Sequence, residues 1–223
     1  MRRLWFPILL GALGVAVLCG LGVWQLGRLA QKEALIAQVE ARIGAEPVAL
    51  PVAPDPEADQ FLPVVATGDI GGGEVHVLTS LPGEGPGYRA VAVLDTGGRR
   101  VMVDLGYIPE AAKGAPRVAE GVTVTGNLHW PDEADSWTPP PDPEMNIWFA
   151  RDVPAMAEAL GTEPLLIVAR GVEGADLGAT PLPVDTSSIR NDHLGYAATW
   201  FGLAVVWAVM SLVLVHRVRR GPA

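Results

Sequence analysis

Two long apolar runs stand near opposite ends of the chain. The first extends over 4–26 and the second over 194–215, and neither contains Asp, Glu, Lys or Arg. Because an α-helix of about 20 apolar residues crosses the hydrocarbon core of a bilayer, the pattern predicts two transmembrane helices that enclose a middle segment, 27–193. A cleaved signal peptide is the alternative for the first run. That run is longer than the apolar core of such a peptide, and Trp24 near its end is typical of a retained helix.

Between the runs the pattern changes first to a helical and then to a β period. Leu35, Val39 and Ile43 recur every four residues, which predicts that the first helix continues to a stop at Gly44. Farther on, short apolar or alternating segments predict strands at 64–68, 75–78, 88–94, 101–105, 122–128 and 165–169. We expect a turn at 71–73 and a short helix at 152–160. The expected fold class is a two-helix transmembrane hairpin enclosing an α+β, mainly β, exported domain.

The distribution of charge predicts the orientation. The chain carries 16 basic and 25 acidic residues, a net charge of −9, whereas segment 33–192 alone carries −16. Cations gather instead at the outer ends of the runs, at Arg2, Arg3, Arg217, Arg219 and Arg220. Because positive residues stay on the cytoplasmic side, we expect 1–3 and 216–223 in the cytoplasm and 27–193 on the exported side of the membrane. This distribution argues against a soluble protein, a nucleic-acid binder and a disordered acidic chain.

The chain offers little recognisable catalytic chemistry. It has no nucleophile elbow, phosphate loop or zinc-protease motif, and its only cysteine, Cys19, lies in the first apolar run. His76 and His129 lie on expected strands without a partner at ligand spacing, and we interpret them as ordinary sheet residues. His216 belongs to the basic flank of the second run. We therefore expect no enzyme, no catalytic residue and no metal site.

His193 stands directly before the second apolar run and is followed by Tyr196 and Trp200. An imidazole beside large aromatic rings at a membrane boundary can hold a flat apolar cofactor such as haem. The alternative is an interfacial aromatic belt, in which Tyr196 and Trp200 anchor the helix and His193 caps it.

Two polar side chains lie near the end of the first run. Gln25 and Arg28 are three residues apart and therefore share one face of the expected helix. Arg28 has two interpretations: its long side chain extends to the interface, or it pairs with Asp192 and closes the hairpin.

Motifs in a fixed order along nearly the whole chain carry a family resemblance. In sequence order they are Gly22-x-Trp24-Gln25-x-x-Arg28, Pro63-Val64, Gly87-Tyr88, Asp104-Leu105-Gly106-Tyr107, Gly126-x-Leu128, Asn146-x-Trp148 and Asn191-x-His193-x-x-Tyr196-x-x-Thr199-Trp200. The chain resembles the surfeit locus protein one (Shy) family, membrane assembly factors for cytochrome c oxidase, and the first and last motifs are the specific ones. It departs from the family pattern at Gln31, where the pattern has Trp, and at Asp104, Leu105 and Tyr107, where it has Asn, Arg and Trp.

The resemblance implies a role in assembling haem-copper cytochrome c oxidase, by helping haem a insertion into subunit I or by stabilising that subunit. Implied partners are subunit I, other oxidase subunits or assembly factors, and the lipid bilayer, with no nucleic acid. Haem a is the implied, transient cofactor, with His193 as axial ligand beside Tyr196 and Trp200. Candidates for partner contact are Trp24, Gln25, Arg28, Asn191 and Thr199. Two alternatives stay open: a scaffold that never holds haem, and a membrane-anchored sensor or ligand-binding module with no oxidase role.

Overall fold

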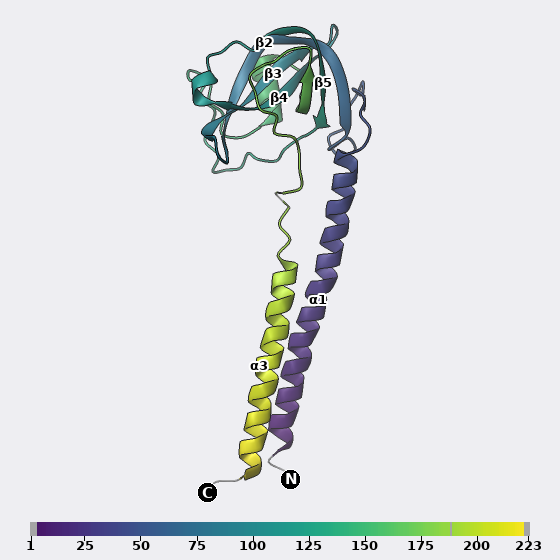
Figure 1. Ribbon diagram of the computed structural model, residues 1–223, viewed down its shortest axis with the longest axis vertical. Coiled ribbons are helices and arrows are strands. Elements are labelled where there is room, and N and C mark those ends of the chain that lie inside the picture. The colour runs from purple at the N-terminus through teal and green to yellow at the C-terminus, as the bar shows by residue number, and fades with distance from the viewer. Residues whose placement is uncertain (1–3, 188, 221–223) are drawn as a thin grey trace. The chain divides into compact units, whose positions relative to one another are not determined.

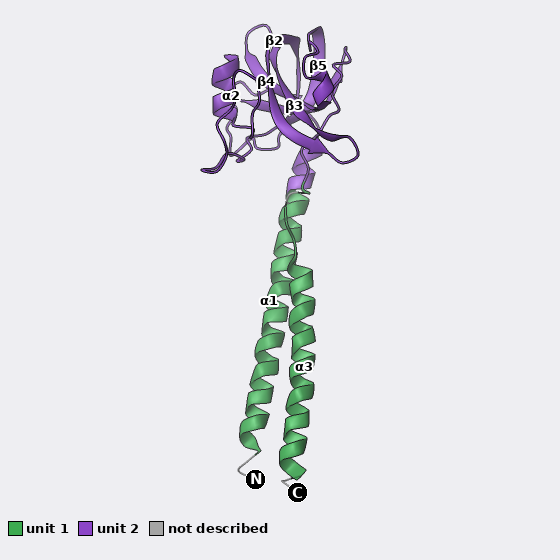
Figure 2. Cartoon of the chain, turned by 90° about the vertical axis from the view of Figure 1, so that its left-hand side faces the viewer, with its two compact units in different colours: residues 1–38, 186–223 green, residues 39–185 purple. Residues whose placement is uncertain are grey.

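The computed structural model describes residues 4–187 and 189–220, and the chain divides into two compact units. The first unit combines 1–38 with 186–223, and the second comprises 39–185 (Figure 2). Arg2, Arg3 and the last three residues of the expected basic tail lie outside the described residues.

Two helices make up the first unit. Helices α1 (Trp5–Ile43) and α3 (His193–Arg220) run side by side in opposite directions (Figure 1). The end of α1 at Ile43 confirms the limit predicted from the four-residue spacing and Gly44. Both helices are long and apolar enough to cross a membrane, and most of their large apolar side chains are exposed.

Small residues allow these two helices to approach closely. A Cβ added to Gly14 would lie 2.1 Å from Nε1 of Trp207, and one added to Gly22 would lie 2.7 Å from the ring of Phe201. Close contact through glycine is typical of helix pairs that gain little from the hydrophobic effect, because it increases van der Waals packing. The pairing of α1 with α3 therefore depends on the absence of side chains at these positions.

A mixed sheet forms the second unit. Its strands are β1 (Val48–Ala49), β2 (Pro63–Leu81), β3 (Gly85–Asp95), β4 (Arg100–Pro109), β5 (Ala119–Leu128) and β6 (Leu166–Glu173), with the short helices η1 (Glu110–Ala112) and α2 (Val153–Leu160). The strand order is β1-β2-β3-β4-β6-β5, and β5 also pairs with β2, which closes the sheet into a barrel. The expectation of a mainly β domain between two apolar helices in the sequence is thereby confirmed.

The turn expected at 71–73 is wrong. These glycines continue β2, so the segments expected as two strands form one, with a bulge between Ile70 and Glu74. Gly72 and Gly73 have φ values of 74° and 141°, which glycine adopts without a steric penalty. The bulge therefore interrupts β2 without ending it: the strand pairs with β5 before the bulge and with β3 on both sides of it.

Side-chain alternation along the strands builds two apolar clusters. On β3, Ala90, Ala92 and Leu94 belong to one cluster, and Val91 and Val93 belong to the other. The second cluster also contains the buried face of α2, formed by Val153, Met156, Ala157 and Leu160. Helix α2 begins after the N-cap Asp152, whose carboxylate accepts a hydrogen bond from the Ala155 backbone amide, and ends at Gly161 in the left-handed conformation. The short helix predicted at this position is thus confirmed.

Candidate functional site

A hydrogen bond joins the two polar residues that the family motifs place near the ends of the apolar runs. The Nδ1 atom of His193, the first residue of α3, lies 2.8 Å from Oε1 of Gln25 on α1, although the residues are 168 positions apart. Gln25 is only 9% exposed and His193 is half-buried. An amide oxygen accepts hydrogen bonds and never donates them, so in the neutral imidazole this contact favours the tautomer with the proton on Nδ1 and the lone pair on Nε2.

Aromatic side chains continue the face of α3 that begins at His193. Tyr196 and Trp200 follow it at spacings of three and seven residues, which places all three on one side of the helix. Tyr196 is exposed and Trp200 is half-buried. No described residue makes a hydrogen bond with Nε2 of His193.

The other polar candidates near the facing ends of the two apolar runs make their hydrogen bonds within their own segments. Arg28 donates to Oε1 of Gln31 at 3.1 Å, whereas Asp192 accepts from Nη2 of Arg190 at 2.7 Å. The pairing of Arg28 with Asp192 is therefore wrong, because each charge finds a polar partner within three residues on its own segment. Thr199 donates to the Gly195 carbonyl one turn earlier.

Trp24 and Asn191 complete this set. The Trp24 side chain is exposed on α1. Oδ1 of Asn191 is buried and has no hydrogen-bond partner among the described residues. Of the motif residues near the facing ends of the two apolar runs, the structure therefore brings Gln25 and His193 into direct contact.

An apolar groove of about 700 Å³ runs along α1 and α3, lined by residues of 7–19 and 208–215. Cys19 lines this groove as a free thiol, together with the small residues Gly11 and Ser211. Apart from Cys19 and Ser211 its lining is apolar, so the groove is mainly an apolar surface.

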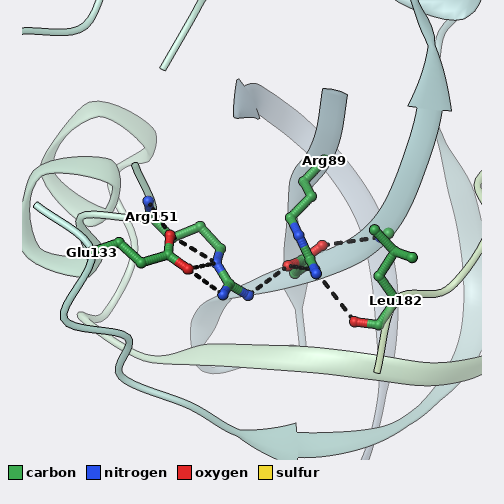
Figure 3. A network of polar contacts seen from close by, with 6 residues as sticks. Arg89, Glu133, Arg151 and Leu182 are labelled. Carbon is green, nitrogen blue, oxygen red and sulfur yellow. Dashed lines mark hydrogen bonds and ion pairs between the residues drawn. The ribbon is translucent and has the colours of Figure 1, made fainter. Parts of the chain in front are cut away.

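A second polar cluster, which the sequence did not predict, lies in the barrel unit. The carboxylate of Asp104 on β4 is fully buried and accepts hydrogen bonds from Arg89 at 2.7 Å and Arg151 at 3.3 Å. Arg151 also binds the carboxylate of Glu133 through its side chain and its backbone amide (Figure 3). Two cations and two anions thus balance, and we call these four residues the Asp104 network.

The pKa values follow from this arrangement. Burial opposes ionisation of Glu133, but hydrogen bonds from Arg151 and its positive charge outweigh burial and hold the pKa of Glu133 below its usual value. Burial likewise opposes the charge on Arg151, yet Glu133 and Asp104 together raise the pKa of this guanidinium. All groups of the network are thus satisfied by one another, which is the arrangement of a structural cluster and leaves no free nucleophile or base.

His76 and His129 pack and form contacts inside the barrel unit. His76 is buried and contacts Glu74 and the amide of Asn146. His129 stacks on Phe61, and burial, assisted by the charge of Arg151, lowers the pKa of His129 to about 4. Within 4–187 and 189–220, no group of three or more His, Cys, Asp or Glu side chains is arranged to hold a metal ion.

One signal in the sequence could have indicated the Asp104 network. Asp104 interrupts an apolar strand, and Arg89 lies on the strand expected before it. A carboxylate inside a sheet requires a partner, and a basic residue on the neighbouring strand is the obvious candidate. Glu133 and Arg151 come from irregular segments, whose approach no sequence pattern predicts.

The fold and the site together define a class of protein in which a closed sheet domain is inserted between two long apolar helices that share a histidine–glutamine pair. The chain belongs to the SURF1 family, whose family model matches residues 12–205. This confirms the resemblance carried by the motifs.

Named relatives are similar over most of their length. A SURF1-like protein of Monosiga brevicollis is 31% identical, over 87% of this chain and 82% of the relative. Surfeit locus protein 1 of Rattus norvegicus is 28% identical, over 91% and 73%. A SURF1-like protein of Rickettsia felis is 28% identical, over 92% of both chains.

Proposed function

We propose that this protein is an assembly factor for haem-copper cytochrome c oxidase, that it spans a bacterial inner membrane twice, and that His193 transiently ligates haem a destined for subunit I. Membership of the SURF1 family supports the role in oxidase assembly. The hydrogen bond between Gln25 and His193 is the observation that carries the haem proposal, because it leaves the unprotonated Nε2 of a half-buried imidazole available.

The exposed apolar surface of both helices supports membrane insertion. Few residues of their most apolar stretches are buried, so in water these helices would expose an apolar surface far larger than a soluble protein tolerates. Arg217, Arg219 and Arg220 end α3, and the acidic segment 33–192 lies between the helices in sequence. Because cations favour the cytoplasmic side, both termini are cytoplasmic and the barrel unit is periplasmic in this proposal.

The residues around His193 fit a haem. Haem a would supply an iron atom that accepts an imidazole nitrogen as axial ligand. His193 offers that nitrogen, and Tyr196 and Trp200 offer aromatic surface on the same face of α3. A single half-exposed histidine suits a carrier that releases its cargo, since a second protein ligand would have to dissociate as well. Release then passes haem a to subunit I, and the protein itself catalyses no reaction.

Two experiments test this proposal. Deleting the gene while leaving the oxidase genes intact should yield oxidase that lacks haem a, and a normally loaded oxidase would contradict the assembly role. The purified protein should carry haem a, and His193→Ala should abolish its Soret band. His216→Ala is the matched control, because His216 lies near the opposite end of α3. Retention of the full spectrum in His193→Ala would exclude His193 as the ligand.

A further inference from the structure

We propose that Gln25 is the positioning residue of His193: it holds the imidazole in the tautomer with the proton on Nδ1, so that Nε2 is the nitrogen offered to iron. The relation to haem rests on the function proposed above, whereas the tautomer does not depend on it. The contact is direct, with 2.8 Å between Nδ1 of His193 and Oε1 of Gln25.

The tautomer matters because an isolated imidazole in water prefers the other one. In that form Nε2 carries the proton, and a protonated nitrogen is no ligand. An acceptor held against Nδ1 reverses the preference, as hydrogen-bond partners of metal-binding histidines generally do. Gln25 meets the requirement, since it is nearly buried on α1 and presents its amide oxygen to His193.

The amide also sets how strongly His193 binds. A carboxylate in the same place would draw the Nδ1 proton toward itself and make Nε2 more basic, which strengthens an iron–imidazole bond. The neutral amide gives the weaker hydrogen bond, and therefore a more labile ligand. A labile ligand is what a transient carrier requires.

The positioning contact exists only when the two helices are paired. Gly22 lies one helical turn before Gln25 on the same helix, and a Cβ there would lie 2.7 Å from the ring of Phe201. The same close approach that packs α1 on α3 therefore sets the position of the Gln25 amide relative to His193. The tautomer of His193 thus depends on helix pairing as well as on the identity of residue 25.

The experiment measures the ring nitrogens directly. The full-length protein, labelled with ¹⁵N-histidine, is reconstituted in nanodiscs, and the His193 signals are assigned by their loss in His193→Ala. We expect a protonated Nδ1 and a bare Nε2 in the unsubstituted protein. Gln25→Met keeps the side-chain length but removes the acceptor, so the proton should move to Nε2. Gln31→Met is the matched control, because Gln31 lies on the same helix and bonds to Arg28 instead.

Two further measurements separate positioning from a general defect. Gln25→Glu should retain the proton on Nδ1, because a carboxyl oxygen accepts a hydrogen bond in either protonation state. Titration with haem a should show affinity lowered about 10-fold or more in Gln25→Met and not in Gln31→Met, the range typical of outer-shell partners. In the ferrous protein, the iron–histidine stretching frequency should differ between Gln25→Glu and the unsubstituted chain.

The outcomes distinguish this inference from the proposed function. Unchanged ring-nitrogen shifts in Gln25→Met would overturn the positioning role, whatever the protein binds. If Gln25→Met misfolds, loss of the Nδ1 proton in Gln25→Glu would overturn it, and its retention would support it. A shifted tautomer in a protein whose unsubstituted form binds no haem a would support the positioning role and refute the haem proposal instead.

Discussion

Replacing Asp104 by Asn should destabilise the barrel unit more than the replacement of any exposed carboxylate by its amide. The Asp104 side chain is 0% exposed and accepts hydrogen bonds from Arg89 and Arg151. The substitution leaves two largely buried guanidinium groups with one carboxylate, Glu133. Removing one partner of a buried ion pair typically costs about 3–5 kcal/mol, because the other charge stays buried without compensation. For a protein of this size that corresponds to a fall in Tm of roughly 6–20 °C.

Urea and thermal unfolding of the full-length protein measure the effect, followed by intrinsic tryptophan fluorescence, to which Trp148, buried against α2, contributes. Glu163→Gln is the matched control. Its ion pair with Arg99 is geometrically good, at 2.6 Å, but the Glu163 side chain is 39% exposed. Water screens such a pair, so its loss should cost less than about 1 kcal/mol. Equal destabilisation by Asp104→Asn and Glu163→Gln would refute the reasoning that burial of the network determines its contribution.

Two other predictions concern the helix pair and the response to acid. Gly22→Leu should push Phe201 away and lower the affinity for haem a. Gly20→Leu should not, since nothing lies within 4 Å of a Cβ at Gly20. Equal haem titration curves for the two variants would contradict this prediction. The lowered pKa of His129, about 4, means that the unfolded chain binds a proton below pH 6.5 while the folded chain does not. The free energy of unfolding should therefore fall as pH decreases from 6.5 toward 4, by up to roughly 2 kcal/mol after allowance for partial exposure. In His129→Leu the urea midpoint should depend less on pH across this range. An unchanged pH dependence in that variant would assign the effect to another group.

Periodicity explains which parts of the fold could be predicted from sequence. The end of α1 at Ile43 follows from a four-residue apolar spacing and a glycine, both of which act locally. The bend in β2 could not be predicted in the same way, since three consecutive glycines suit a turn and a bulge equally. Closure of the barrel decides between them, because β2 must pair with both β3 and β5, and that requirement comes from strands distant in sequence.

The residues of the candidate site could be predicted from the sequence, but the contact between them could not. His193 and Gln25 both stand in motifs, and each lies at the polar end of an apolar run. Which face of α1 meets which face of α3 depends on helix rotation and register, which the glycine contacts with Trp207 and Phe201 determine. Hydropathy does not indicate which side of a helix faces its partner when the helix is apolar on every side. Only the paired helices therefore show that Gln25 contacts His193.

The neutrality of Gln25 suits its place in the fold as much as the role proposed for it. It is a nearly buried residue one turn beyond Gly22, at the polar end of the apolar run within α1, where an ionised side chain would be expensive to bury. A carboxylate would fix the same tautomer, but it would add the cost of a buried charge and a stronger iron ligand. An amide fixes the tautomer without either consequence. Burial and the proposed transient ligation thus favour the same side chain at this position.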